Sequence, residues 1–269
     1  MSAVPESSRP IADQPSLLRE DRDGVATLTM NRPAQMNLLT AEMLDALQSS
    51  FGLIEKDPDI RVVVLAAAGM GFCAGHDLKE IRELRELPKI TALFAKCSAM
   101  MLTIPRLPQP VIAKVQGAAA AAGCQLVAQC DLAVAVDTAK FVTSGVSWGF
   151  FCSTPGVAIG RNLQRKHAME MLLTGEPINA ARALEWGLVN KVVAAADLDA
   201  EVLALAKTLA SKPPGTMAAG KRAFYQQMDM DLTRAYALAG EVIASSFAHA
   251  EGREGMDAFI EKRPPGWKK

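Results

Sequence analysis

Two segments of the chain share one layout, and that layout limits the possible folds more than any other feature of the sequence. Residues 62 to 77 and 111 to 131 each begin with a short run rich in valine, of the length and composition expected for a buried strand. Each run then gives way to glycine and alanine, whose small side chains leave backbone N–H groups accessible to a ligand oxygen. In the second segment these residues begin a predicted helix, whose dipole adds to the donors. Two such turns facing each other would form an oxyanion hole.

The bulk composition indicates a globular chain with no general attraction to nucleic acid or lipid. The 269 residues fit one large domain, or one domain with a tail, and 50% of them are hydrophobic. Lys+Arg and Asp+Glu both number 29, so the formal net charge is zero and no global field would attract nucleic acid. The longest apolar windows are too short and too rich in alanine and glycine to span a bilayer. We therefore expect neither nucleic acid nor a membrane as a partner.

The N-terminus and the cysteines indicate the compartment. The first sixteen residues contain Glu6 and Asp13 and no apolar stretch, so we predict no secretory signal or transit peptide, and a disordered lead at residues 1 to 15. The five cysteines show no CxxC pairing, which favours free thiols in a reducing compartment. The predicted location is the cytoplasm. The three histidines are scattered, so no metal site is predicted.

Hydrophobic periodicity and turn residues predict an α/β fold followed by a helical region. An Asp-Gly turn joins two predicted strands into a hairpin, and Thr40 can cap the first helix. The charged stretch at residues 79 to 86 is predicted to be a solvated helix or flap. The predicted strands are residues 16 to 20, 25 to 30, 62 to 65, 111 to 115, 132 to 136 and 140 to 142; the predicted helices are residues 41 to 56, 88 to 104, 122 to 130, 165 to 173, 179 to 186, 197 to 211, 213 to 227, 232 to 248 and 251 to 262.

The two strand-turn-helix units suggest a weak internal repeat rather than a doubly wound sheet. After them, helices dominate the sequence. We therefore divide the chain into the lead, a core at residues 16 to 200 and a helical C-terminal region at residues 201 to 269.

Two short motifs suggest other chemistries, and the surrounding sequence argues against both. Residues 69 to 74 fit the G-x-G-x-x-G/A dinucleotide fingerprint, but a charged helix occupies the interval in which that motif needs a second strand ending in an acidic residue. Residues 145 to 149 fit the G-x-S-x-G nucleophile elbow, with Asp197 and His249 following in the right order. An elbow needs a helix directly after the serine, whereas residues 150 to 155 are predicted to be a loop. We expect Ser147 to be an ordinary hydroxyl.

Taken in order, the motifs resemble those of the enoyl-CoA hydratase/isomerase, or crotonase, superfamily. The resemblance covers the chain from about Val25 to the C-terminus. Each motif alone is weak, but this many motifs in the order of the family identify the family specifically. The pieces are MNRP at 30 to 33, NLL at 37 to 39, FCAGHDLK at 72 to 79, PVIA at 110 to 113 with Gly117, GC at 123 to 124, CDL at 130 to 132, LLTGEPI at 172 to 178 and GLV at 187 to 189. Three further segments resemble one subgroup of the family: AAGCQL at 121 to 126, FCSTPG at 151 to 156 and KRAFY at 221 to 225.

The resemblance implies a fold, a ligand and a set of site residues. The fold would be α/β, a crotonase-like spiral of ββα repeats with a helical C-terminal trimerisation region, and the chain would form homotrimers or hexamers. The ligand would be an acyl-CoA thioester, with coenzyme A as part of the substrate and no separate cofactor. The backbone N–H groups of His76 and Ala122 would form the oxyanion hole, where two fixed donors stabilise an enolate. The other substrate-binding residues would be Ala34, Met36, Asn37, Leu38, Ala74, Asp77, Leu78, Lys79, Gly123 and Lys221.

The sequence departs from the family pattern at the two positions where hydratases of the family carry their catalytic glutamates. Hydratases of the family use two glutamates to activate water and to move its proton, and this chain has Gln125 and Gly145 in their places. A carboxamide can hold a water but cannot take its proton, and glycine has no side chain. Standard hydration therefore lacks an evident acid or base. We expect His76 to contribute its backbone rather than its ring.

Three functional alternatives stay open. The first is a hydratase-like lyase or an isomerase whose chemistry comes from other groups near the site. The second is an acyl-CoA enzyme with a bound anion such as bicarbonate as its base, as in the naphthoate synthases of this superfamily. The third is a non-catalytic acyl-CoA-binding or regulatory protein. The nearby groups for the first are Cys73, His76, Ser144, Ser147 and Cys152, and those that could hold an anion are Gln125, Thr143 and Ser144.

Overall fold

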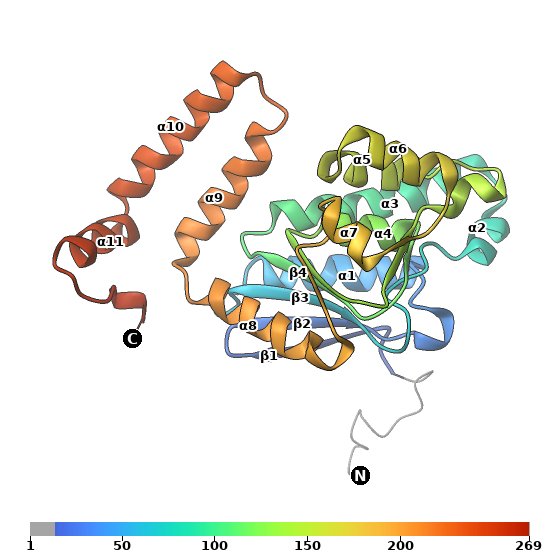
Figure 1. The fold of residues 1–269 in the computed structure, drawn as a ribbon, viewed down its shortest axis with the longest axis horizontal. Coiled ribbons are helices and arrows are strands. Elements are labelled where there is room, and N and C mark those ends of the chain that lie inside the picture. The colour runs from blue at the N-terminus through green and yellow to red at the C-terminus, as the bar shows by residue number, and fades with distance from the viewer. Residues whose placement is uncertain (1–13, 269) are drawn as a thin grey trace, which may run out of the picture.

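The computed structural model describes residues 14 to 268 and places them in an α/β fold (Figure 1). The predicted disordered lead, residues 1 to 15, lies outside the described residues apart from its last two. A six-stranded sheet runs through the body in the order β1-β2-β3-β4-β6-β9. Its strands are β1 (Leu17–Arg22), β2 (Val25–Met30), β3 (Val62–Ala67), β4 (Val111–Val115), β6 (Leu132–Val136) and β9 (Lys191–Val193).

The parallel strands of this sheet all end at the same edge. β1 pairs with β2 in antiparallel fashion as the predicted hairpin, and every later pair in the sheet is parallel. The carboxyl ends of β2, β3, β4, β6 and β9 therefore share one edge, which is where open α/β sheets bind their ligands. Both small-residue turns of the sequence follow strands of this parallel group.

Helices on both faces explain why the strands are continuous apolar runs. All six residues of β3 are buried, as expected for a parallel strand covered on each side. Figure 1 shows α1 (Ala41–Ile54) and α3 (Leu87–Arg106) on one face and α8 (Leu198–Ala210) on the other. The predicted cap of α1 forms, because Thr40 Oγ1 accepts a hydrogen bond from the Met43 N–H at 3.2 Å.

A second, three-stranded sheet carries the other half of the site. It consists of β5 (Ala119–Ala120), β7 (Lys140–Val142) and β8 (Ile178–Asn179), in that order. A single parallel bridge between Cys73 and Ala119 links the first turn to this sheet. Helix α4 (Ala122–Gln129) begins directly after β5, and the exposed charged stretch after the first turn forms α2 (Leu78–Leu84).

The prolines produced the main errors in the predicted helices. Residues 150 to 155 were predicted to be a loop, but α5 (Ser153–Asn162) begins inside this range. Pro155 lies in the first turn of α5, where its missing N–H would have no partner in the helix anyway. Likewise α3 continues through Pro105 and ends at Arg106. The remaining helices of the core are α6 (Arg165–Thr174) and α7 (Ala180–Glu185), and the short 3₁₀ helices are η3 (Pro33–Gln35), η4 (Ser144–Trp148), η5 (Ala195–Asp197) and η6 (Gly266–Lys268).

Helix α3 also has the length and apolar composition of a membrane-spanning helix. One such helix is weak evidence, because core helices of soluble proteins share these properties. In this structure five residues of α3 lie in the core: Leu93, Cys97, Met100, Met101 and Ile104.

The C-terminal helices form an arm that extends from the body (Figure 1). The arm consists of α9 (Pro214–Gln227), α10 (Leu232–Ala248) and α11 (Ala250–Ile260). The buried residues of these helices are Ala235 of α10 and Ala258 of α11; no whole residue of α9 is buried, although the Lys221 side chain of α9 is only 8% exposed. Helix α8 instead packs on β2, β3, β4 and β6. The body therefore continues to about residue 210, ten residues beyond the boundary predicted at residue 200.

Candidate active site

Backbone hydrogen bonds join the two turns that follow β3 and β4. The N–H groups of Phe72 and Cys73 donate to the Ala118 carbonyl oxygen at 2.9 and 3.2 Å, and the Ala120 N–H donates to the Cys73 oxygen at 2.8 Å. Gly123, at the start of α4, packs so closely on the first turn that an added Cβ would lie 2.1 Å from the Cys73 oxygen. The glycine is therefore required for the approach of α4 to the first turn.

The two predicted oxyanion donors lie in these joined turns. Within the described residues, neither the His76 N–H nor the Ala122 N–H donates to an acceptor of the chain. Gly75 has φ +91°, and a Cβ added there would lie 3.2 Å from the Ala122 nitrogen. The residue preceding His76 thus lies beside the nitrogen of Ala122. The first turn therefore contacts the start of α4 next to His76, although His76 and Ala122 are 46 positions apart in the sequence.

An unusual backbone conformation starts α4. Ala121 has φ +48° and ψ −117°, a combination that costs a residue with a Cβ about 1–3 kcal/mol. Its N–H donates to the Val142 oxygen of β7 at 2.8 Å, so the second sheet holds the residue in place. The abrupt change of chain direction at Ala121 leaves the first N–H groups of α4 outside the helical hydrogen-bond pattern.

The segment from Met36 to Leu39 is fixed to the first turn. The Ala74 N–H donates to the Met36 oxygen at 3.0 Å, and the Leu39 N–H donates to the Gly75 oxygen at 2.8 Å. Asn37 is fully buried, and its Nδ2 donates to two carbonyl oxygens of the loop after β3, at 2.9 and 3.0 Å. The Asn37 side chain therefore braces the turn, whereas Met36 is exposed beside it.

Other predicted substrate-binding residues lie at the surface of the same region. Ala34 is exposed and Leu38 is half-buried, and both lie in the segment between β2 and α1. Asp77 caps α2 by accepting the Lys79 N–H at 2.8 Å. Leu78 is 56% exposed, and the Lys79 side chain is also at the surface.

The two positions at which the resemblance implies glutamates, Gln125 and Gly145, have different surroundings. Gln125 is only 5% exposed, and its Oε1 has no hydrogen-bond partner among the described residues. A Cβ added to Gly145 would lie 2.6 Å from the Phe150 oxygen and 2.8 Å from Cys152 Sγ. A carboxylate could therefore replace the Gln125 amide at little steric cost, but a side chain at position 145 requires the loop around Phe150 to move.

The cysteines near the site are thiols at neutral pH. Burial raises the pKa of Cys73 and of Cys124 to about 12, and burial also raises the pKa of Cys152. A nucleophilic cysteine needs a lowered pKa, so these residues act in packing. Ser147 is exposed in η4, a 3₁₀ helix rather than the strand-to-helix turn of a nucleophile elbow.

The side chain of Lys221, which the resemblance implies to be substrate-binding, is hydrogen-bonded within the chain instead of being free at the surface. Its Nζ donates to the Ile104 and Gln109 oxygens, both at 2.9 Å, and to Asp131 Oδ2 at 2.6 Å. These three bonds use all three ammonium protons. Tyr225 donates to the other Asp131 oxygen at 2.8 Å. The sequence reasoning missed this buried network, because the residues come from three distant segments.

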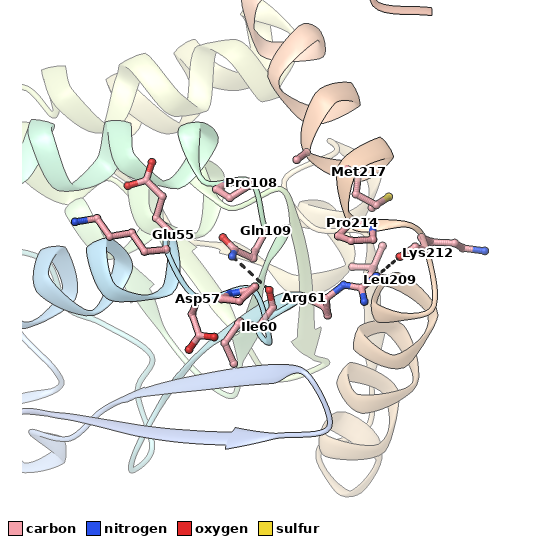
Figure 2. A pocket seen from close by; sticks show the side chains of 14 residues that line it. Glu55, Asp57, Ile60, Arg61, Pro108, Gln109, Leu209, Lys212, Pro214 and Met217 are labelled. Atoms are coloured by element: carbon pink, nitrogen blue, oxygen red, sulfur yellow. Dashed lines mark hydrogen bonds between the residues drawn. The ribbon is translucent and has the colours of Figure 1, made fainter. Parts of the chain in front are cut away.

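A hollow of about 330 Å³ lies at the opposite end of the strands (Figure 2). Ile60 and Gln109, which line it, lie two residues before β3 and β4. Gln109 Nε2 donates to the Ile60 oxygen at 3.3 Å, a bond that Figure 2 marks with a dashed line. Arg61 donates to the Lys212 oxygen across the same hollow. Because the joined turns follow the carboxyl ends of these strands, the hollow is separate from the candidate active site.

Two sheets joined through paired glycine- and alanine-rich turns define a crotonase fold, and comparison with solved structures confirms it. An enoyl-CoA hydratase of Mycobacterium smegmatis superposes with a TM-score of 0.93 and 50% identity, over 95% of this chain and all of that one. The chain belongs to the enoyl-CoA hydratase/isomerase family, whose sequence model matches residues 20–269.

The relatives named enoyl-CoA hydratase domain-containing protein 3 confirm the predicted subgroup. The mitochondrial protein of that name from Mus musculus is 44% identical over 246 residues, which cover 91% of this chain and 82% of the mouse protein. The crystal structure of the human protein of that name superposes with a TM-score of 0.91 at 43% identity, covering 94% of this chain and all of that one.

The predicted cytoplasmic location is contradicted by these relatives. Five proteins of this name, 42% to 44% identical to the chain, are called mitochondrial. The prediction relied on the composition of the first sixteen residues, most of which lie outside the described residues, and on free thiols; the cysteines of the described chain are indeed free. Free thiols indicate a reducing environment but do not distinguish one reducing compartment from another.

Proposed function

We propose that the chain binds an acyl-CoA thioester and holds its carbonyl oxygen between the His76 and Ala122 N–H groups. One observation supports this proposal: two backbone donors without acceptors in the described chain lie in turns that contact each other at the carboxyl edge of the sheet. Fixed donors are most effective where negative charge develops, and the enolate of a thioester places that charge on the carbonyl oxygen. Family membership supports the same class of ligand.

The coenzyme A part would lie along the exposed residues beside the first turn. Four residues of this surface are at least partly exposed: Met36, Leu38, Leu78 and Lys79. They belong to the segments before α1 and after the first turn, which backbone hydrogen bonds hold together. Gly123 and Asn37 are buried beneath this surface and hold the turns in place, so they would not contact the ligand. Lys221 is left out of the proposed site, because its ammonium protons are already donated within the chain.

The proposed reaction class is enolate chemistry, as in an isomerase or a hydratase-like lyase, without the usual pair of carboxylates. Gln125 can hydrogen-bond a water or a substrate group but cannot remove a proton. Gly145 has neither a side chain nor space for one. An anion as base is less well supported, because Thr143 already donates its hydroxyl to the Met171 oxygen at 2.7 Å and the unpartnered atom of Gln125 is an acceptor.

Calorimetric titration with butyryl-CoA tests the proposed oxyanion hole. Ala122→Pro removes one donor at the first position of a helix, where the missing N–H leaves no intrahelical hydrogen bond unmade. We expect the Kd of this variant to rise about three- to tenfold, as one lost hydrogen bond of about 0.5–1.5 kcal/mol implies. Ala122→Ser keeps the N–H and is the matched control. Equal affinities of the two variants would contradict the role of Ala122, and no binding by the unchanged chain would contradict the whole proposal.

A further inference from the structure

The imidazole ring of His76 has a fixed orientation and a fixed tautomer. Its Nδ1 lies 3.1 Å from the Leu39 oxygen, and because a carbonyl only accepts hydrogen bonds, Nδ1 carries the proton. The Leu39 N–H in turn donates to the Gly75 oxygen at 2.8 Å. This pair of links fixes the ring relative to the backbone N–H of the same residue, which is the proposed oxyanion donor.

The other ring nitrogen of His76 is a buried acceptor without a donor. Nε2 has no hydrogen-bond partner among the described residues, and the ring contacts Phe94 of α3 edge-on, with 4.9 Å between the ring centroids. A buried acceptor without a donor destabilises the folded chain. Such a group in a native structure calls for an explanation, such as a functional role or a bound partner.

The surroundings keep this nitrogen free of a proton. Burial lowers the pKa of His76, and the bond to the Leu39 oxygen only partly opposes this, so the ring is neutral at pH 7. Of the nearby carboxylates, Asp77 caps α2 and Glu80 accepts the Ala41 N–H at the start of α1. Neither contributes to the pKa shift. The nearby thiol of Cys73 is protonated.

We infer that His76 Nε2 accepts the proton from the carbon next to the thioester carbonyl, the task for which the family carboxylates are missing here. The inference rests on the proposed function, because it needs the acyl thioester bound in the oxyanion hole. His76 then supplies a backbone donor for the enolate oxygen and a side-chain acceptor for the proton.

The proton transfer is balanced and reversible. The bond between the α-carbon and its hydrogen breaks, its electron pair forms the enolate, and the negative charge moves to the thioester oxygen between the two N–H donors. The proton forms the new bond to Nε2, giving an imidazolium that still donates from Nδ1 to Leu39. In D₂O the proton on Nε2 exchanges with the solvent, and return of a deuteron from Nε2 to the α-carbon regenerates a labelled thioester and the neutral ring.

Deuterium exchange at the α-carbon of butyryl-CoA, followed by mass spectrometry in D₂O, tests the inference. His76→Asn keeps both the backbone donor and an amide that can reach the Leu39 oxygen, but it removes Nε2. We expect exchange to fall at least about 100-fold, as for loss of a general base, while the Kd for butyryl-CoA changes less than threefold. His249→Asn, the same change at an exposed residue of the arm, is the control and should exchange like the unchanged chain.

The pH profile provides a second readout. General base catalysis needs the neutral ring, so we expect exchange to decline as the pH falls through an apparent pKa below 6.5. Exchange that survives in His76→Asn, with or without added bicarbonate, would overturn the inference, and so would binding without any exchange by the unchanged chain. His76→Gln serves if His76→Asn proves unfolded by circular dichroism. Absence of butyryl-CoA binding would instead refute the proposed function.

Discussion

At the scale of single residues, small side chains decide whether the site can form. Gly123 allows α4 to contact the first turn, and Gly75 adopts a left-handed conformation beside the nitrogen of Ala122. Ala121 carries the strain of the sharp bend before α4. Glycines and alanines were recognisable in the sequence as positions of close backbone approach, but the partner that each one approaches was not.

Replacing Ala121 by glycine should relieve this strain. Glycine adopts positive φ without a steric penalty, so we expect the free energy of unfolding of Ala121→Gly to equal or exceed that of the unchanged chain, by up to about 1 kcal/mol. Ala204→Gly, at an exposed position inside α8, should cost about 1 kcal/mol and is the control. Urea unfolding measures both. A loss of stability in Ala121→Gly as large as in the control would show that the bend is not strained.

At the scale of elements, a buried ion pair attaches the arm to the body. The Lys221 side chain of α9 is 8% exposed and bonds Asp131, which also accepts the Val111 N–H at 2.7 Å. The lysine and aspartate therefore connect α9 with the starts of β4 and β6. Helical periodicity predicted α9 correctly, but it gave no sign that a charged residue of this helix is buried.

Removing the lysine should be far more harmful than removing the tyrosine of the same network. Lys221→Met leaves Asp131 buried without its counter-ion, and we expect a loss of about 3–5 kcal/mol in the free energy of unfolding. Tyr225→Phe removes one hydrogen bond to the carboxylate and should cost about 1.5–3 kcal/mol. Thermal unfolding of the two variants checks the order. Equal stabilities would mean that the ion pair does not hold α9 in place.

At the scale of the whole molecule, the arm has apolar side chains that the single chain leaves uncovered. The exposed large apolar residues of its helices and connections are Phe224, Met228, Met230, Leu232, Tyr236, Ile243, Phe247, Met256, Phe259 and Ile260. A chain that exposes so many apolar residues on one part of its surface usually binds another protein there. We propose that further copies of the chain, in a homotrimer or hexamer built through the arm, cover this surface.

The oligomeric state can be measured by light scattering after size-exclusion chromatography. We expect the unchanged chain to elute as a trimer or hexamer, and the double variant Tyr236→Glu/Ile243→Glu to shift toward the monomer, because two charges are placed in an apolar contact. Leu53→Glu, at an exposed position of α1 on the body, should leave the state unchanged. A monomeric parent chain would contradict this assignment.

The sequence by itself determined the family and most elements of this fold, but it did not predict α5 or the short strands β5, β8 and β9. Local signals were sufficient for β2, for β4 and for most helices, because side-chain periodicity and caps depend on neighbours along the chain. They were insufficient at Pro155, where a residue that breaks helices in their interior is harmless in the first turn. The family motifs also identified Gln125 and Gly145 as departures before their surroundings were known.

Only the tertiary structure decided what those positions can do. It showed that Gly145 has no room for a side chain, that Lys221 is committed to Asp131, and that the His76 ring has one nitrogen bonded and one free. Each of these properties depends on atoms from segments far apart in the chain, whose mutual distances are not encoded in any local pattern. The sequence indicated the two turns, and the packing of β5 and α4 against the turn after β3 brought the two turns into contact.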